Sequence, residues 1–497
     1  MGIKAKLSLP FAKIIRSKTK KWSSKPIETQ EKVFKHLISK AKKTTFGKDH
    51  KFELIDNYED FKKQVPIRTY EDLKSYIDQI VAGNEDVTWP GKPIYLSKTS
   101  GTTSGAKYIP LTKESIPYHI DAARDAILHY IAETKKVHFV DGKMIFLQGS
   151  PELDLSYKIP VGRLSGIVAH YVPNYLQRNR MPSLKVNCIE DWEEKVLAIC
   201  KETLAEDMRL ISGIPPWVQM YFEKLIAISG KENIKSIFPN FSLFIYGGVN
   251  YEPYRANMEK LIGKRIDSIE LYPASEGFIA FQDSQNKEGM LLLLNSGIFY
   301  EFIPAAEFFN ENPTRISLKD VALHVNYVII LNTNAGLWGY NIGDTVKFVS
   351  LSPYRIVVSG RIKHYTSAFG EHIIAEEVEK AIQYAVEKTG LMVAEFHLAP
   401  QVNPKEGKLP YHEWFVEFLD PNSDVTDFST ALNEKMMELN PYYNDLINGK
   451  ILRNLIISKV RKDGFLDYMK SQGKLGGQNK LPRLANDRKI AESLHLL

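Results

Sequence analysis

The sequence predicts an α/β protein with a large N-terminal domain of mixed sheets and flanking helices and a small α+β domain at the C-terminal end. The chain has 497 residues, more than one hydrophobic core usually fills. Short apolar runs bounded by Gly, Asn, Pro or Asp are mixed with segments of helical periodicity. The pattern changes near residue 360, and the remainder has the size of a small domain. We therefore expect domains at 1–360 and 361–497.

The composition is that of an ordinary soluble protein, with 44% hydrophobic and 25% charged residues. No stretch approaches the 18 apolar residues of a membrane span, so we expect no integral membrane association. Only Cys188 and Cys200 occur, too few for a disulfide framework, which favours a reducing compartment. The formal net charge of +6 comes largely from the two ends, and nucleic-acid binding is not expected. We expect a cytoplasmic protein.

The first 25 residues carry eight Lys/Arg and no acid, and their apolar stretches are too short for a signal peptide. We expect this end to be solvated and partly disordered. Association with an anionic membrane surface is the alternative.

Several helices and strands can be placed from periodicity. Residues 28–43 put Val33, Phe34, Leu37, Ile38 and Ala41 on one helical face. Further helices are expected near 115–133, 192–205 and 215–228, and after the loop that follows Gly360. Strands are expected at 144–148, 241–248, 268–272, 290–294, 298–303, 327–331, 354–358, 391–398 and 413–418.

One loop has a composition that suits phosphate binding. The stretch "LSKTSGTTSGAKYIPLT" at 96–112 is rich in glycine and hydroxyl residues, whose N–H and O–H groups can replace water around phosphate oxygens. Gly101, Gly105 and Lys107 do not have Walker spacing. Taken alone, such a loop is more often a polar surface turn.

Three later segments of the chain bear on the role of this loop. They are "SLFIYGGVNYEPY" at 242–254, "IELYPASEGFIAFQ" at 269–282 and "GLWGYNIGDTVKFV" at 336–349. In the third segment, Asp344 is expected on a turn before a strand. Each alone reads as an ordinary strand end or turn. Their order along the chain is that of adenylate-forming ligases. The residues resemble the auxin-responsive acyl-acid amido synthetases and their bacterial relatives, from "AKKTTFGKDHKFELI" near the start to "GGQNKLPRL" near the end. The resemblance implies a luciferase-like N-terminal domain and a C-terminal lid domain.

The resemblance also implies the binding of ATP and Mg²⁺. The loop residues Thr99, Ser100, Gly101, Thr102 and Thr103 would hold the β- and γ-phosphates, with Lys107 as supporting charge. Gly247 and Gly248 would flank the adenine on one side and Tyr272 on the other. Ser275 would lie near the α-phosphate, Glu276 would coordinate Mg²⁺, Asp344 would accept the ribose hydroxyls and Arg361 would assist there.

In this superfamily the lid turns about a hinge, here Lys363, and supplies a catalytic lysine, here Lys480. A basic solvated tail is the alternative interpretation of 458–489. The sequence departs from the plant members where Gly339 and Asn341 flank Tyr340, because those members commonly carry arginines around the Gly-Asp motif. This departure concerns the second half-reaction and the substrate more than ATP binding.

The implied reaction is adenylation of a carboxylic acid, followed by transfer of the acyl group to an amine, an amino acid in this family. An acyl-CoA synthetase is one alternative, and a non-catalytic nucleotide- or lipid-binding protein on the same scaffold is another. The apolar and aromatic stretch "ISGIPPWVQMYF" indicates a hydrophobic or aromatic acid. The sequence specifies neither the acid nor the oligomeric state.

Overall fold

The computed structural model describes residues 2–100, 106–171, 178–189, 191–362, 365–366, 369, 373–402, 404, 409–448, 451–475, 480–485 and 487–497. The chain forms two compact units, which are described separately. Unit 1 comprises Met1–Ile214, Lys235–Gly248 and Ile266–Val357. Unit 2 comprises Pro215–Ile234, Val249–Arg265 and Val358–Leu497.

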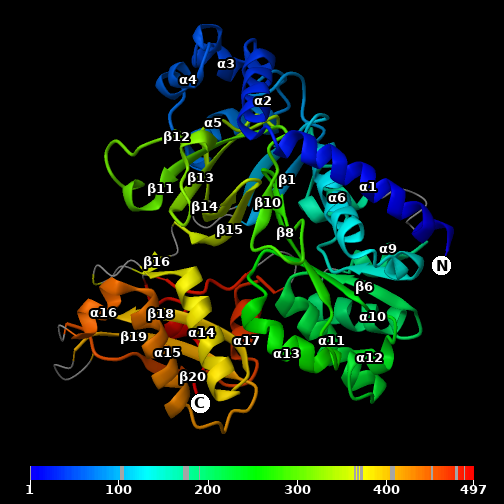
Figure 1. The fold of residues 1–497 in the computed structure, drawn as a ribbon, viewed down its shortest axis with the longest axis vertical. Helices are drawn as coiled ribbons and strands as arrows, with labels where there is room; N and C mark the ends of the chain where they lie inside the picture. The colour runs from blue at the N-terminus through cyan, green and yellow to red at the C-terminus, as the bar shows by residue number, and fades with distance from the viewer. Residues whose placement is uncertain are drawn as a thin grey trace. The chain divides into compact units, whose positions relative to one another are not determined.

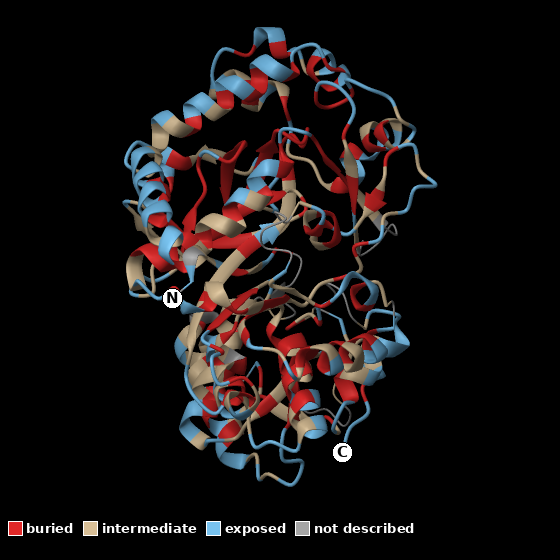
Figure 2. Cartoon of the chain, turned by 90° about the vertical axis from the view of Figure 1, so that its right-hand side faces the viewer, coloured by how far each residue is buried: buried red, intermediate tan, exposed pale blue. Residues whose placement is uncertain are grey.

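A 12-stranded mixed sheet runs through unit 1 (Figure 1). Its strands, in spatial order, are β12 (Ile316–Ser317), β11 (Ile298–Pro304), β13 (Asn326–Thr333), β14 (Tyr340–Leu351), β15 (Tyr354–Arg361), β10 (Met290–Leu292), β9 (Gly277–Phe281), β8 (Asp267–Ala274), β7 (Leu243–Gly247), β6 (Met208–Ser212), β3 (Lys143–Phe146) and β5 (Arg180–Met181). Most of the strands are buried, as Figure 2 shows.

The strands β8, β7, β6, β3 and β5 are parallel, whereas β8–β9, β9–β10, β10–β15 and β13–β14 pair antiparallel. Parallel strands are covered on both faces, which explains the continuous apolar run of β7, from Leu243 to Tyr246, all of it buried. Parallel strands also end at one edge of the sheet, where α/β proteins place their ligands. Gly247, Ala274 and Phe146 therefore end their strands at the same edge.

A separate three-stranded sheet carries the glycine- and hydroxyl-rich loop. Its order is β2 (Ala106–Leu111), β1 (Tyr95–Ser100) and β4 (Val161–Gly162). The strands β1 and β2 pair antiparallel, with Ser100 opposite Ala106. The sequence analysis predicted neither strand, because it interpreted residues 96–112 as a loop.

Helices surround the sheets of unit 1. They are α1 (Ile3–Ser23), α2 (Pro26–Ala41), α3 (Thr45–Asp49), α4 (Tyr58–Gln64), α5 (Tyr70–Val81), α6 (Ile116–Thr134), α7 (Leu164–Ala169), α9 (Leu184–Asn187), α10 (Trp192–Thr203) and α12 (Ile234–Ile237), which reaches the boundary with unit 2. The predicted helices at 28–43, 115–133 and 192–205 are confirmed as α2, α6 and α10. None of the helices in the described ranges is both long and apolar enough to cross a membrane.

The expectation of a solvated, partly disordered N-terminal end is wrong. Residues from Ile3 onward form α1, which lies along α6 (Figure 1). Ala5, Ala12 and Ile15 are buried, and Thr19 is hydrogen-bonded to Nε2 of His129 at 2.9 Å. These residues recur at helical spacing and make one apolar stripe. The stripe is buried in a shared core, and this burial stabilises the helix despite its many lysines.

Unit 2 contains an α+β arrangement. The strands β18 (Val393–Gln401), β19 (Tyr411–Phe418) and β20 (Ile456–Lys459) form one sheet, with β18–β19 antiparallel and β19–β20 parallel. Its helices and remaining strands are α11 (Pro215–Ser229), α13 (Glu252–Ile262), β16 (Tyr365–Thr366), β17 (Ile373–Ile374), α14 (Ala375–Thr389), α15 (Thr426–Leu439), α16 (Pro441–Asn448) and α17 (Gly464–Ser471). The large buried side chains of Trp414, Phe396 and Phe428 lie in one core.

The division of the chain is less simple than a single boundary. Unit 1 ends at Val357, close to the expected boundary at 360, but α11 and α13 precede that point and still belong to unit 2. The role of 361–497 as a lid is a separate matter of function and stays a prediction. The α/β class, with mixed sheets and a C-terminal α+β arrangement, is confirmed.

Candidate functional site

The strands β1 and β2 hold two of the residues predicted to contact phosphate. Thr99 is half-buried and pairs directly with Lys107 across the hairpin. Directly opposed residues of an antiparallel pair point to the same face of the sheet, so the side chains of Thr99 and Lys107 share one face. Lys107 Nζ also lies 5.4 Å from the centre of the Tyr70 ring. Gly101, Thr102 and Thr103, and the side chain of Ser100, lie outside the described residues.

The turn between β8 and β9 lies against β1. Ser275 is buried on this turn, and its Oγ is 2.9 Å from Oγ of Ser97, 178 positions earlier in the chain. Glu276 follows and is half-buried. The hydrogen bond fixes the hydroxyl predicted to face the α-phosphate relative to the strand that leads into the glycine-rich loop. The sequence analysis did not identify Ser97. Its role becomes visible only from its buried position in β1.

Tyr272 and Asp344 are joined directly. The buried Tyr272 donates from Oη to Asp344 Oδ2 at 2.6 Å. The sequence predicted Asp344 on a turn, but the structure places it inside β14. The position is irregular, because Val328 pairs with Thr345 and Ile330 with Asn341, so three residues of β14 oppose one of β13. This bulge allows the carboxylate to point towards β8.

The structure explains why Gly339 and Asn341 stand where the plant members commonly carry arginines around the Gly-Asp motif. Gly339 has φ +57°, and a Cβ there would lie 2.4 Å from the carbonyl oxygen of Pro66. Asn341 Oδ1 accepts from the N–H of Gly343 at 2.8 Å, inside the bulge that carries Asp344. A guanidinium has no acceptor and could not make this bond. Asn341 therefore supports the position of Asp344.

Gly247 ends β7 at the edge of the sheet where its parallel strands end, and Gly248 follows it. A Cβ on Gly247 would lie 2.5 Å from the carbonyl oxygen of Leu271 on β8, and Gly248 has φ +87°. Both positions therefore need glycine for the backbone itself. They leave an uncovered stretch of main chain beside the strand that carries Tyr272, which is compatible with a flat ring.

The donor set of unit 1 fits ATP. Asp344 is an acceptor for hydroxyls, Tyr272 offers an aromatic ring, and Thr99, Ser275 and Lys107 offer donors for phosphate oxygens. Glu276 fits Mg²⁺, which is commonly held by one or two carboxylates together with phosphate oxygens. These residues come from β1, β2, β8 with its turn, and β14. Hydrogen bonds join Tyr272 to Asp344 and Ser275 to Ser97 of β1.

The other predicted residues belong to unit 2. Arg361 is exposed at the end of β15, and Lys480 is exposed. Lys363 lies outside the described residues. The segment after Lys480 is attached to β18: Leu398 N–H donates to the Arg483 carbonyl at 2.9 Å, and Ala485 N–H donates to the Leu398 carbonyl at 3.0 Å. Lys480 therefore lies at the start of a segment whose later part, residues 483–485, is hydrogen-bonded to β18.

A buried cluster of charged residues around Arg483 holds the segment 483–485 in place. Arg483 is 8% exposed and donates to Glu395 and to the hydroxyl of Tyr254 on α13. Its Nε lies 3.8 Å from an oxygen of Glu379, and burial raises the pKa of that carboxyl. The guanidinium also lies over the ring of Phe396, 4.4 Å from its centre. This cluster could not be predicted from the sequence, because its members are scattered over more than 200 positions.

Comparison with models of known protein families identifies a family for this chain. Three models of one family match the chain in order: the GH3 family N-terminal domain at 15–183, the GH3 family central domain at 291–361 and the GH3 family C-terminal domain at 376–489. Together they cover most of the sequence.

Two curated relatives illustrate the range of similarity. The jasmonoyl–L-amino acid synthetase JAR4 of Nicotiana attenuata is 24% identical over 357 residues, which are 58% of this chain and 60% of that protein. This alignment therefore spans less than two thirds of that relative. The indole-3-acetic acid-amido synthetase GH3.15 of Arabidopsis thaliana is 22% identical over 557 residues, covering 94% of this chain and 92% of that protein.

Solved structures share the fold over nearly the whole chain. A GH3.15 acyl acid amido synthetase superimposes with a TM-score of 0.78 at 17% identity, covering 97% of this chain and 96% of that one. A closely similar match is that enzyme in complex with 2,4-DB. A 2-hydroxyisobutyryl-CoA ligase in complex with 2-HIB-AMP gives 0.63 at 12% identity over 94% and 90%. The order of the three domain models and the shared fold lead to one conclusion: the chain belongs to the GH3 family.

Proposed function

We propose that this protein is an ATP-dependent ligase that adenylates a carboxylic acid and transfers the acyl group to the amine of an amino acid. The observation that carries the proposal is the joining of Tyr272 to Asp344 and of Ser97 to Ser275 in a chain of the GH3 family. The relatives' names refer to jasmonoyl and indole-3-acetic acid conjugation, which supports a hydrophobic or aromatic acid as the first substrate.

In the first step, a carboxylate oxygen of the acid attacks the α-phosphorus of ATP, and the bond to the β-phosphate oxygen breaks to release pyrophosphate. Asp344 accepts the ribose hydroxyls, assisted by Arg361, and Tyr272 lies against the adenine. The hydroxyls and N–H groups of 99–103, with Lys107, hold the phosphates, and Ser275 faces the α-phosphate. Lys480 neutralises charge that develops on the oxygens in the transition state.

Glu276 would hold Mg²⁺, which supplies charge neutralisation at the phosphates when bound. The half-buried position of Glu276, directly after Ser275, supports this assignment. Removal of Mg²⁺ by a chelator would abolish adenylation while leaving the fold intact.

In the second step, the neutral amine attacks the acyl carbon, AMP leaves and the amine loses a proton. The 361–497 part would turn about Lys363 between the steps, as a lid that moves Lys480 away from the site. Lys363→Pro would then spare adenylation and block amide formation. Equal loss of both half-reactions would contradict the hinge assignment.

The test is ATP–pyrophosphate exchange with Mg²⁺ and a panel of aromatic, indolic and fatty carboxylates, followed by product analysis with amino acids and with coenzyme A. Exchange with one acid and an amide product support the proposal. A thioester product would instead make the protein an acyl-CoA synthetase. ATP binding without exchange for any acid would favour a nucleotide-binding protein without catalysis.

A cytoplasmic location is part of the proposal. Neither Cys188 nor Cys200 forms a disulfide bond, in agreement with a reducing compartment. Fractionation of cells that produce the full chain tests this location.

A further inference from the structure

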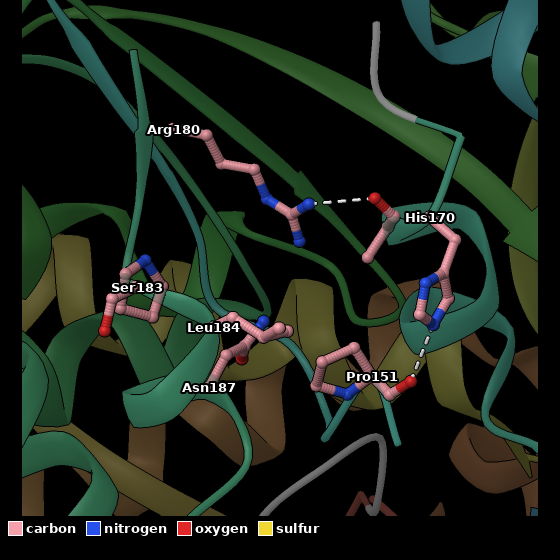
Figure 3. Close-up of a pocket in the computed structure, with 8 residues that line it drawn as sticks. Pro151, His170, Arg180, Ser183, Leu184 and Asn187 are labelled. Atoms are coloured by element: carbon pink, nitrogen blue, oxygen red, sulfur yellow. Dashed lines mark hydrogen bonds between the residues drawn. The ribbon is translucent and has the colours of Figure 1, made fainter. Parts of the chain in front are cut away.

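A cavity of about 320 Å³ lies at the ligand-binding edge of the large sheet of unit 1, beyond the ends of β5 and β3. It is lined by Pro151, Ala169, His170, Arg180, Pro182, Ser183, Leu184 and Asn187 (Figure 3). Four strand spacings separate β5 from β8, about 19 Å at the usual distance between strands. The cavity is therefore distinct from the position of Ser275 and Tyr272.

Arg180 contributes an unbalanced charge to this cavity. Figure 3 shows its guanidinium directed over the space between His170, Pro151 and Leu184. Its Nη1 donates to the carbonyl oxygen of Ala169 at 2.9 Å. With the Gln148 amide oriented so that its oxygen faces the guanidinium, Nη2 donates to it at 2.7 Å. Both partners are neutral, and no carboxylate of the described residues pairs with Arg180.

A second cation shares the same network. Lys195 is 2% exposed, and its Nζ donates to the carbonyl oxygens of Asn187 at 2.5 Å and Gln148 at 3.1 Å. Burial is the main cause that lowers the pKa of Lys195 to about 8. Arg180 and Lys195 thus lie close together around Gln148 and Asn187, and the acceptors that the described residues offer them are all neutral, which is a costly arrangement.

Among the residues that the structure describes, none at the rim pairs an anion with Arg180. Glu202 is near the mouth, but its carboxylate accepts from Ser183 Oγ at 2.5 Å and from Ser183 N–H at 2.8 Å. His170 donates from Nε2 to the carbonyl oxygen of Pro151 at 2.8 Å. Asn187 Oδ1 is buried without a hydrogen-bond partner beside the cavity.

From these contacts we propose that the cavity is a binding site for a small organic carboxylate, held by the guanidinium of Arg180. A planar carboxylate matches the edge of a guanidinium and can accept two parallel hydrogen bonds from it. The prolines, Ala169 and Leu184 give the remaining wall an apolar surface. An organic body fits such a wall better than a free phosphate, which needs donors on all sides.

The test is isothermal titration of the full chain with benzoate, with neutral benzamide and with inorganic phosphate. Arg180→Gln removes the charge. Leu184→Glu places a competing carboxylate on the wall of the cavity. Leu184 is 68% exposed, so this substitution should not destabilise the fold. Leu155→Glu, at a leucine 72% exposed and outside the lining, is the matched control, and Arg178→Gln is the control for the loss of charge.

We expect benzoate to bind the wild-type chain and both controls with equal affinity, and to bind about tenfold or more weakly to Arg180→Gln and Leu184→Glu. Benzamide should bind none of them at this site. The proposal is overturned if benzoate affinity is unchanged in Leu184→Glu, if benzamide binds as well as benzoate, or if phosphate binds as tightly as benzoate. Pyrophosphate exchange, measured separately, reports on the proposed function and does not enter this comparison.

Discussion

Tyr272 and Asp344 share a 2.6 Å hydrogen bond although β15, β10 and β9 stand between their strands in the sheet order. The bond therefore closes across a strongly curved part of the sheet. A carboxylate held in this way would lose little entropy on accepting the ribose hydroxyls that we propose it binds, because its orientation is already set. Tyr272 thus positions Asp344 in addition to offering its ring.

Substitution of Asp344 should lower kcat/KM for ATP more than substitution of Tyr272. Asp344→Asn should lower kcat/KM for ATP by about 10- to 100-fold, since hydrogen bonds to charged groups contribute about 1.5–3 kcal/mol. Tyr272→Phe keeps the ring and should lower it by about tenfold or less. Steady-state exchange kinetics measure both, with the exposed Asp320→Asn as control. An Asp344→Asn enzyme with normal kinetics would remove Asp344 from the site.

Lys480→Ala should slow adenylation by about two to three orders of magnitude, because one charge-stabilising group in a transition state contributes about 3 kcal/mol. Single-turnover measurement of pyrophosphate release is the appropriate test. Lys474→Ala, an exposed lysine shortly before it, should leave the rate unchanged. If both variants lose activity equally, the basic-tail interpretation of this region gains support.

Arg483→Met should destabilise unit 2 by about 3–5 kcal/mol, because it leaves Glu395 and Glu379 buried without their partner. Hydrogen exchange at the amides of Leu398 and Ala485 gives a local measurement, since both amides bond across the segment that Arg483 anchors. Arg461→Met breaks the more exposed pair with Asp467 and should cost less than about 1 kcal/mol. Unchanged protection in Arg483→Met would show that the cluster does not anchor the segment.

Glu417 gives a prediction for pH dependence. Burial raises its pKa to about 7 from an ordinary value of 4.5, despite hydrogen bonds from the backbone N–H groups of Asp463 and Phe465. The folded state therefore binds the proton more tightly than the unfolded state, and stability falls as the pH rises from about 4.5 through 7.

Glu417→Gln keeps the acceptor for both N–H groups and removes this loss. Relative to the wild type it should gain stability on the order of 3 kcal/mol between pH 4.5 and pH 8, measured by urea unfolding at several pH values. Glu434→Gln, at an exposed carboxylate of unit 2, is the control. A constant difference between the wild type and Glu417→Gln across this range would contradict the raised pKa.

Local patterns predicted much of the fold. The stripe of Phe34, Leu37 and Ile38 identified α2, and the apolar run of β7 identified a buried strand, because both depend on neighbours in sequence. The helix α1 was missed since its lysines conceal a stripe of only a few small residues. Asp344 was placed on a turn because a Gly-Asp pair usually marks one, whereas here β13 holds it in a bulge.

Long-range relationships could not be read from the sequence alone. The resemblance to a family supplied the order of the ATP-binding residues, but not the bond between Ser97 and Ser275 or the support that Asn341 gives to the bulge. The cluster around Arg483 and the cavity beside Arg180 depend on segments that only the tertiary fold brings together. Buried charges of this kind carry no local signature.

The attachment of α13 to unit 2 has a consequence for any attempt to separate the two units. The chain passes between them at Ile214, Ile234, Gly248, Arg265 and Val357, so neither is a continuous piece of sequence. A fragment that begins at residue 358 would lack Tyr254, and Arg483 would lose a buried partner. Limited proteolysis near residue 360 should thus yield two pieces that remain associated. Transplanting only the C-terminal piece onto a related enzyme would carry Arg483 into a foreign setting without the tyrosine that it binds.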